Sequence, residues 1–289
     1  MTTIRIERLP TPLQAYRKIV KSMVLKARST PQRVLPDLEY VVERLTIDLD
    51  HLQRYAAICQ FASMQTLPPT YLAVLSQSLQ MLMMAEPEFP FPVLGLVHIH
   101  NQVSQNRPVK PSETIRLSCR FGTLKPHEKG LQFEFLTTAK VGDEEVWTGS
   151  STYLMRQKSS TAESRPAPRQ EKVARKEGDR QENWTVPGDI GRLYGLISGD
   201  INPIHLHPLS AKLFGFPKAI AHGMWTKARC VAALGKLPDA FDIDVQFKLP
   251  VLLPASVEFH AQPAGQQVAF ELTDARNGKP HLAGTLTQR

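Results

Sequence analysis

The chain has 289 residues, of which 42% are hydrophobic and 21% charged. This length suits one large domain or two small ones, and the composition is that of an ordinary globular protein. No apolar run reaches the roughly 18 residues of a membrane span, and no secretory leader pattern is found. Three scattered cysteines argue against a disulfide framework or a zinc site. We therefore expect a protein of the reducing cytoplasm.

The formal net charge of +8, with a pI near 9.4, suggests an anionic partner. Nucleic acid is disfavoured as that partner, because the chain has no zinc-finger spacing, no RRM signature and no interleaving of aromatic and basic residues. A phosphorylated small molecule would explain the charge equally well, and so would a solvated basic surface without a specific partner. We expect no nucleic-acid partner.

We expect the first 36 residues to form an N-terminal extension that precedes two similar halves of the chain. Within it, residues 13–27 have the periodicity of an amphipathic helix. The basic side chains of this run would form its solvated face. Its inward face would consist of Leu13, Tyr16, Val20, Met23 and Ala27.

Residues 37–156 and 184–289 share one pattern, in which a short helix and a longer apolar helix precede several strands. The longer helices are expected over Thr70–Ala85 and His222–Leu234. The strands are period-2 runs separated by Pro and Gly turns, as in an antiparallel sheet. A helix followed by such strands predicts an α+β domain with the helix packed on the sheet. The first long helix is rich in Leu and Met, which fits either a packed core or the adaptable wall of a cavity.

Residues 157–183 differ sharply in composition from both halves. They include seven Lys or Arg, five Asp or Glu, two Pro and almost no large apolar residues. Such a segment cannot bury enough surface to offset the entropy of ordering it. We expect it to be a linker between two halves of similar size.

Short sequence matches in the same order indicate that the two halves arose by duplication. The matching segments are 54–59 with 192–198, 108–112 with 250–256, 114–119 with 256–261, and 133–135 with 270–272. The last pair is followed in each half by a hairpin signal, Gly142-Asp143 or Asn277-Gly278. Each match is weak alone, but their common order favours two copies of one fold.

The halves differ in one loop, and this loop holds the candidate catalytic residues. His222 follows Gly199 by 23 positions, whereas Pro68 follows Gln60 by only eight. The extra segment of the second half carries Asp200, Asn202 and His205 in one short turn. A carboxylate and an imidazole held by one turn suit acid–base chemistry on a water molecule. A purely structural alternative is that Asp200 or Asn202 caps a helix starting near Pro208.

The turn resembles the MaoC-like family of (R)-specific enoyl-CoA hydratases, also called hydratase 2. The family pattern runs from an aromatic residue through G-D-x-N-P-aliphatic-H to a small residue. The segments 214–216 and 220–224 are also similar to that family. The resemblance implies two hot-dog repeats, each a long central helix wrapped by a curved antiparallel sheet. The pattern is filled by Tyr194, Ile197, Ser198, Gly199, Asp200, Asn202, Pro203, Ile204, His205 and Ala211.

The resemblance also implies roles for individual residues. Asp200 and His205 would be the catalytic dyad, and Asn202 would orient the water or Asp200. The N–H of Gly223, at the start of a central helix, would hold the enolate oxygen of the thioester. His222 would shape this turn rather than act as a base. The expected substrate-binding residues are Tyr194, Ser198, Gly199, His222, Met224 and Trp225.

The expected substrate is a CoA or acyl-carrier thioester, with no metal and no redox cofactor, bound by a monomeric double hot-dog or a homodimer. Its phosphates would need cations, and Arg192, Lys227 and Lys248 lie in the right half. The Met-rich helix could then line an acyl tunnel. One departure is that Arg229–Val231 stand where some family members place a hydroxyl facing the thioester.

Two other functions remain open on the sequence. A hot-dog thioesterase would need an acidic group on the central helix, but none follows Gly223 until Asp239. A non-catalytic acyl-thioester binding protein is disfavoured by the intact Asp, Asn and His set of the second half. We infer, in contrast, that the first half has kept the fold and lost the chemistry.

Overall fold

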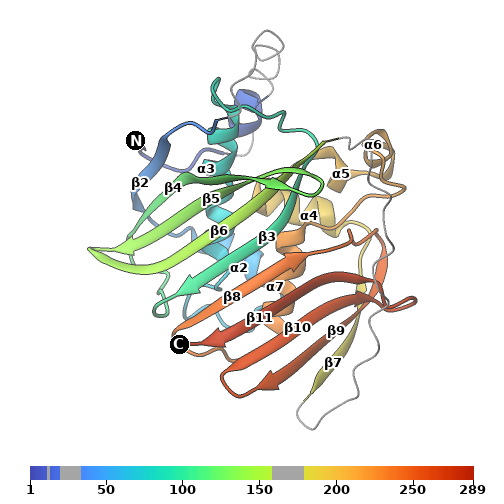
Figure 1. Cartoon of the computed structure of the whole chain (residues 1–289). Helices are drawn as coiled ribbons and strands as arrows, with labels where there is room; N and C mark the ends of the chain where they lie inside the picture. The colour runs from blue at the N-terminus through green and yellow to red at the C-terminus, as the bar shows by residue number, and fades with distance from the viewer. Residues whose placement is uncertain (12–13, 20–33, 158–178) are drawn as a thin grey trace.

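The computed structural model describes residues 1–11, 14–19, 34–157 and 179–289 (Figure 1). Its strands form one eleven-stranded sheet in the order β1-β2-β4-β5-β6-β3-β8-β11-β10-β9-β7. The first half supplies β1 (Thr2–Ile6), β2 (Leu38–Leu45), β3 (Leu96–Gln105), β4 (Ile115–His127), β5 (Gly130–Val141) and β6 (Glu144–Arg156). The second half supplies β7 (Arg180–Val186), β8 (Phe241–Phe247), β9 (Ala255–Ala264), β10 (Gln267–Asp274) and β11 (Pro280–Gln288).

The strand order reveals the internal repeat. Outward from the middle of the sheet, the first half runs β3-β6-β5-β4-β2 and the second runs β8-β11-β10-β9-β7. The two series meet where β3 and β8 pair antiparallel, with His100 opposite Gln246 and Gln105 opposite Phe241. Equivalent strands therefore occupy equivalent places. The α+β double hot-dog expected from the sequence is confirmed.

The helices lie on one side of the curved sheet (Figure 1). They are α2 (Leu49–Cys59), α3 (Tyr71–Ala85), α4 (Ile190–Ser198), α5 (Pro203–Leu206), α6 (Pro208–Leu213) and α7 (Gly223–Ala233). The two long helices expected from the sequence are α3 and α7, each within one residue of its expected bounds. Most side chains of α3 are buried, including Met81, Met83 and Met84 at 4% exposure or less. A helix that is apolar nearly all round is stable only in such a central position.

The two repeats are joined by buried polar contacts as well as by the sheet. Lys227 of α7 is fully buried, and its ammonium donates to the side-chain and main-chain oxygens of Asn101 in β3, at 2.5 and 3.0 Å. The indole N–H of Trp225 donates to the carbonyl of Ile58 at 3.0 Å. Buried polar groups are costly unless paired, so these contacts fix how the halves sit together.

Two expectations need adjustment. The linker expected over residues 157–183 ends earlier than predicted, because Arg180–Val186 forms an edge strand that pairs with β9. Its mostly polar composition is compatible with an edge, where one face remains in water. Residues 158–178 of the expected linker lie outside the described residues.

In the N-terminal extension, residues 14–19 are helical. The buried residues there are Ala15 and Ile19, with Tyr16 half-buried, so the inward face is rotated from the expected one. The other expected inward residues, Leu13, Val20, Met23 and Ala27, lie outside the described residues.

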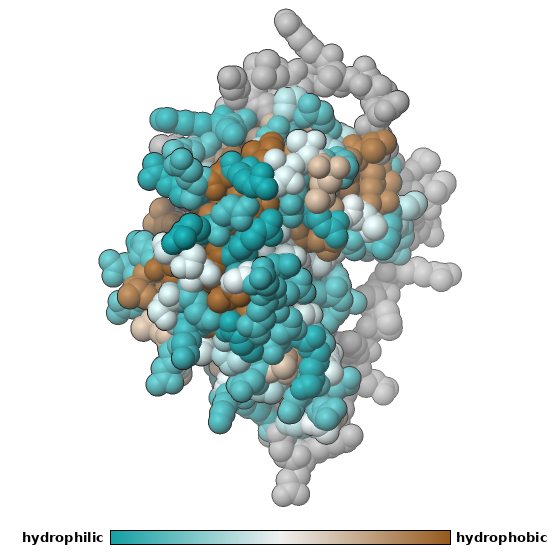
Figure 2. All heavy atoms as spheres, turned by 90° about the vertical axis from the view of Figure 1, so that its left-hand side faces the viewer, coloured by the Kyte–Doolittle hydropathy of each residue, from teal (hydrophilic) through white to brown (hydrophobic). Residues whose placement is uncertain are grey.

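The outer surface is mainly polar. Figure 2 shows one face of the molecule, where hydrophilic side chains cover most of the area and apolar ones show in smaller patches between them. Among the described residues, no helix is both long and apolar enough to cross a lipid bilayer.

Candidate active site

The candidate catalytic residues lie on the turn that leads from α4 into α5. Helix α4 ends at Gly199, whose φ of 79° is the left-handed conformation that glycine adopts without strain. Three residues later Asn202 caps α5, its side-chain oxygen accepting the N–H of Ile204 at 3.4 Å, with Pro203 at the first helical position. Asp200 lies between the two ends, and His205 lies on the first turn of α5. The short motif thus fixes both side chains locally.

Among the described residues, one ring nitrogen of His205 has a hydrogen-bond partner and the other has none. Its Nδ1 lies 2.8 Å from the carbonyl oxygen of Ile220. A carbonyl only accepts hydrogen bonds, so Nδ1 carries the proton and Nε2 carries the lone pair. Burial lowers the pKa of His205, despite the opposing charge of Asp200. The neutral imidazole therefore offers a proton acceptor at Nε2.

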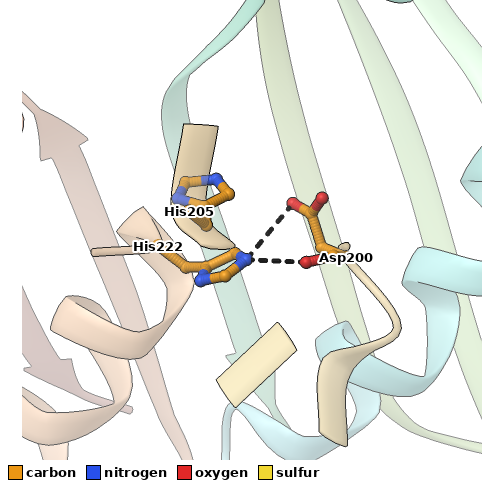
Figure 3. A group of neighbouring side chains, drawn as sticks. All are labelled: Asp200, His205 and His222. Carbon is orange, nitrogen blue, oxygen red and sulfur yellow. Dashed lines mark hydrogen bonds and ion pairs between the residues drawn. The ribbon is translucent and has the colours of Figure 1, made fainter. Parts of the chain in front are cut away.

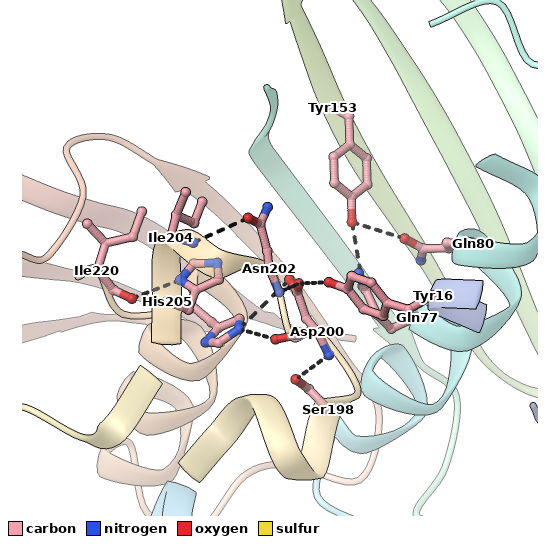
Figure 4. A network of polar contacts seen from close by, with 11 residues as sticks. Tyr16, Gln77, Gln80, Tyr153, Ser198, Asp200, Asn202, Ile204, His205 and Ile220 are labelled. Carbon is pink, nitrogen blue, oxygen red and sulfur yellow. Dashed lines mark hydrogen bonds and ion pairs between the residues drawn. The ribbon is translucent and has the colours of Figure 1, made fainter. Parts of the chain in front are cut away.

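Asp200 is anchored by four neighbouring groups (Figure 4). Its Oδ1 accepts the N–H of Asn202 at 3.2 Å and the hydroxyl of Tyr16 at 3.2 Å. Its own N–H donates to the hydroxyl of Ser198, and its carbonyl accepts from His222. Burial acts to raise the pKa of the Asp200 carboxyl, but the two histidines and the donated hydrogen bonds outweigh it and hold the pKa below its usual value. The side chain is an anion and is still 28% exposed.

His222 contacts both Asp200 and His205 (Figure 3). Its Nε2 donates to the main-chain oxygen of Asp200 at 2.9 Å and lies 3.8 Å from Oδ2 of the carboxylate. Its ring stacks on His205 with centroids 3.6 Å apart. Burial lowers the pKa of His222 to about 3, so the ring is neutral. Its buried Nδ1 has no hydrogen-bond partner within the described part of the chain.

Asp200, His205 and His222 each offer a ligand atom within 4.8 Å of the others, so the group could hold a metal ion. The contacts favour a different use. Each histidine already donates one ring N–H to a main-chain oxygen, and the two rings are stacked rather than converging on one point. One water molecule can bridge a carboxylate and an imidazole at this spacing by two hydrogen bonds.

The N-terminus of α7 lies beside the dyad, because the helix begins directly after His222. The first N–H groups of a helix have no acceptor inside it, and the helix dipole favours negative charge there. A Cβ at Gly223 would lie 3.1 Å from the ring of Phe247, so glycine also allows close packing at this point. The Gly223 N–H is therefore a donor suited to a developing oxyanion.

The other expected substrate-binding residues have different places. Tyr194 is buried and packs against the ring of His222 at 5.1 Å between centroids. Ser198 and Gly199 build the turn itself, and Met224 is half-buried against the core. Trp225 is 5% exposed, and its indole N–H donates to the carbonyl of Ile58 in the first repeat.

The first repeat and the extension contribute polar groups that are not among the expected site residues (Figure 4). Tyr153 of β6 donates to the side-chain oxygen of Gln80 on α3 at 3.1 Å. His98 of β3 stacks on Tyr153 at 4.6 Å, and burial lowers its pKa to about 3. Tyr16 reaches Asp200 from the N-terminal extension. Only Tyr16 had a signal in the sequence, which was its place on the expected inward face.

Helix α4 approaches α5 so closely that we expect Gly191→Ala to destabilise the protein by about 1–3 kcal/mol, the usual cost of overpacking. A Cβ at Gly191 would lie 2.3 Å from the carbonyl oxygen of His205. Urea unfolding of the variant and the wild type measures the difference. The control is Gly188→Ala, where the nearest atom would be 3.8 Å away. Equal midpoints for the two variants would contradict the close approach.

Comparisons with known proteins place the chain in a family. Residues 169–284 match the family model of the MaoC like domain. The chain is 33% identical over 253 residues to 3-hydroxyacyl-thioester dehydratase X of Mycobacterium tuberculosis (strain ATCC 25618 / H37Rv), covering 87% of this chain and 90% of that protein. The chain belongs to the MaoC-like dehydratase family. The match spans both repeats of this MaoC-like protein, since it covers most of both chains.

Solved structures extend the likeness to the whole fold of the MaoC-like protein. The crystal structure of HtdX from Mycobacterium tuberculosis superposes with a TM-score of 0.76 at 32% identity, covering 86% of this chain and 99% of that one. A MaoC-like dehydratase from Phytophthora capsici has a TM-score of 0.68 at 19% identity, covering 90% and 98%. The second likeness is one of fold alone.

Proposed function

We propose that the protein catalyses the reversible hydration of trans-2-enoyl thioesters to (3R)-hydroxyacyl thioesters, with Asp200 and His205 as the dyad. The observation that carries the proposal is that an ionised carboxylate and a neutral imidazole lie within 4.8 Å on one rigid turn. Both are proton acceptors in the resting site. The name of the M. tuberculosis relative, a 3-hydroxyacyl-thioester dehydratase, supports the reaction class.

Two acceptors are what a nucleophilic water requires. The water donates one hydrogen to Oδ2 of Asp200 and the other to Nε2 of His205, which leaves an oxygen lone pair directed at C3 of the enoyl group. As the O–C3 bond forms, one O–H bond breaks and the C2=C3 pair moves onto the thioester as an enolate. The proton held by the dyad then passes to C2. Dehydration follows the same steps in reverse.

The stereochemistry follows from the dyad's position on one side of the substrate. Because one turn holds both groups, hydroxyl and proton are added to the same face of the double bond. The (3R) configuration is part of the proposal, and it rests on the resemblance of the turn to that of (R)-specific hydratases.

The negative charge that develops on the thioester oxygen needs a donor that is fixed in advance. The Gly223 N–H fills this role at the start of α7, where the helix dipole adds to the hydrogen bond. Asn202 acts through Asp200: its N–H binds the carboxylate and its side chain caps α5. Asn202 is therefore a positioning residue.

The acyl group would be carried by CoA or an acyl-carrier protein, and the reaction would use no metal and no redox cofactor. Arg192 and Lys248 are exposed and remain candidates for the carrier phosphates. Lys227 is not a candidate for binding the phosphates, because it is fully buried and already donates to Asn101. The acyl tunnel along α3 remains a hypothesis, since its methionines are buried among core residues.

The test is to incubate the protein with crotonyl-CoA and a longer trans-2-enoyl-CoA, and to follow the loss of the enoyl thioester absorbance. Chiral analysis of the product and titration of free thiol accompany the assay. Formation of the (3R)-hydroxyacyl-CoA without thiol release is the expected result. Thiol release would instead identify a thioesterase. Binding of both thioesters without turnover would favour a non-catalytic binding protein.

A further inference from the structure

Tyr16 reaches the dyad from outside both hot-dog repeats. It lies in the N-terminal extension, and its hydroxyl donates to Oδ1 of Asp200 at 3.2 Å across 184 residues of sequence (Figure 4). We propose that Tyr16 is a positioning residue that occupies one oxygen of the Asp200 carboxylate and so leaves the other for the substrate water. This inference rests on the proposed function of the dyad.

The extension is built to hold Tyr16 in place. Thr11 and Gln14 form a capping box: the N–H of Thr11 donates to the Gln14 side chain at 2.9 Å, and the N–H of Gln14 donates to the Thr11 hydroxyl at 3.4 Å. Ala15 and Ile19, four residues apart on one face of the helix, are 0% and 5% exposed. The start and the orientation of this helix are therefore fixed, and Tyr16 follows directly from the buried Ala15.

The two oxygens of Asp200 have different surroundings. Oδ1 accepts two hydrogen bonds, from the Asn202 N–H and from the Tyr16 hydroxyl, both at 3.2 Å. Oδ2 lies 3.8 Å from Nε2 of His222, whose hydrogen is directed to the Asp200 carbonyl at 2.9 Å. A carboxylate whose Oδ1 is filled in this way presents Oδ2 as its basic oxygen. The rotation of the carboxylate is fixed by the same two donors.

The Tyr16 phenol is a permanent donor. Burial and the negative charge of Asp200 raise the pKa of Tyr16 far above its usual value, so the hydroxyl keeps its proton at any working pH. Its hydrogen bond in turn helps to lower the pKa of Asp200. A hydrogen bond to a charged group is stronger than one between neutral groups, which makes this contact effective on a half-buried carboxylate.

No other tyrosine among the described residues takes this place. Tyr153 directs its hydroxyl to Gln80 and Gln77 of α3, at 3.1 and 3.5 Å. Tyr194 lies beneath His222 and has no hydrogen bond to the carboxylate within the described residues. The titratable groups that act on Asp200 are His205, His222 and Tyr16, with His98, Tyr153 and Tyr194 acting through charge at longer range.

The test is Tyr16→Phe, which removes the hydroxyl and keeps the ring. We expect kcat to fall about tenfold and KM to change less than about twofold, because the lost hydrogen bond acts on the base and not on substrate binding. Loss of a donor to the ionised form raises the pKa of Asp200. The acid limb of the kcat/KM profile should therefore move to higher pH. Carbon NMR of ¹³C-labelled aspartate should show the same displacement in the Asp200 titration.

The matched control is Tyr40→Phe. Tyr40 also donates its hydroxyl to a carboxylate, that of Glu86 at 2.5 Å, but this pair lies within the first repeat. Its loss should leave kcat and the Asp200 titration unchanged. Equal behaviour of the two variants, or a change in KM alone for Tyr16→Phe, would overturn the inference. If the wild type lacks hydratase activity, the proposed function fails, and the NMR titration still decides whether Tyr16 acts on Asp200.

Discussion

Asp200→Asn and His205→Ala are each expected to reduce kcat for enoyl thioester hydration by about 1,000-fold, within the range that general acid–base groups contribute. Asparagine keeps the shape of the side chain and can still accept the hydrogen bonds of Tyr16 and Asn202 at its oxygen. It loses the charge and the second proton acceptor. Alanine at position 205 removes the other acceptor, Nε2. The measurement is the initial rate of crotonyl-CoA hydration at saturating substrate.

The double variant distinguishes a shared water from two independent contributions. If Asp200 and His205 hold the same water molecule, either loss already abolishes its activation, and the second loss adds little. We therefore expect the double variant to be only slightly slower than the worse single variant, as found for groups that act as a unit. Multiplication of the two single effects would show that the residues act separately.

The control for these variants is Asp189→Asn. Asp189 is exposed and precedes α4 without making a side-chain capping bond, so its charge is local to the same segment but outside the site. Its activity should equal that of the wild type. Activity above about a tenth of the wild-type value in Asp200→Asn, with normal thermal unfolding, would contradict the role of the carboxylate.

The local part of the site could be predicted because its geometry is encoded in consecutive residues. Gly199 ends a helix in the left-handed conformation, and Asn202 with Pro203 starts the next one. The spacing between these signals sets where Asp200 and His205 lie. The repeat could be predicted for a similar reason, since three of the four matched pairs of segments fall on equivalent helices or strands of the two halves, and the fourth pair leads into β4 and β9.

The remote part of the site depends on contacts between segments far apart in the chain. Tyr16 and His98 come from the extension and the first repeat, and nothing near them in sequence records that they approach Asp200. Lys227 shows the opposite case. From the sequence it is one of three candidate cations for the carrier phosphates, but α7 is central and the side chain is buried between the repeats, where it donates to Asn101. Composition alone cannot tell a buried cation from an exposed one.

A substitution of His222 tests the site further, because His222 does more than shape the turn: it donates to the main chain of Asp200 and stacks on His205. We expect His222→Phe to lower kcat by roughly 10- to 100-fold, with a smaller change in KM. Phenylalanine keeps a flat ring to stack on His205 but removes the N–H that Asp200 accepts at 2.9 Å. An unpaired buried carbonyl costs about 1–3 kcal/mol, which the turn would relieve by moving Asp200.

A displacement of this size matters because acid–base groups act only within hydrogen-bond reach of the water, and small errors in position cost large factors in rate. The matched control is His281→Phe, since His281 is also buried in the second repeat and also donates a ring N–H to a carbonyl, that of Leu249 at 3.0 Å. Both variants should lose stability in urea unfolding, but only His222→Phe should lose kcat. Equal kcat values in the two variants would mean that His222 contributes only to the stability of the fold, and that the turn positions Asp200 without help from His222.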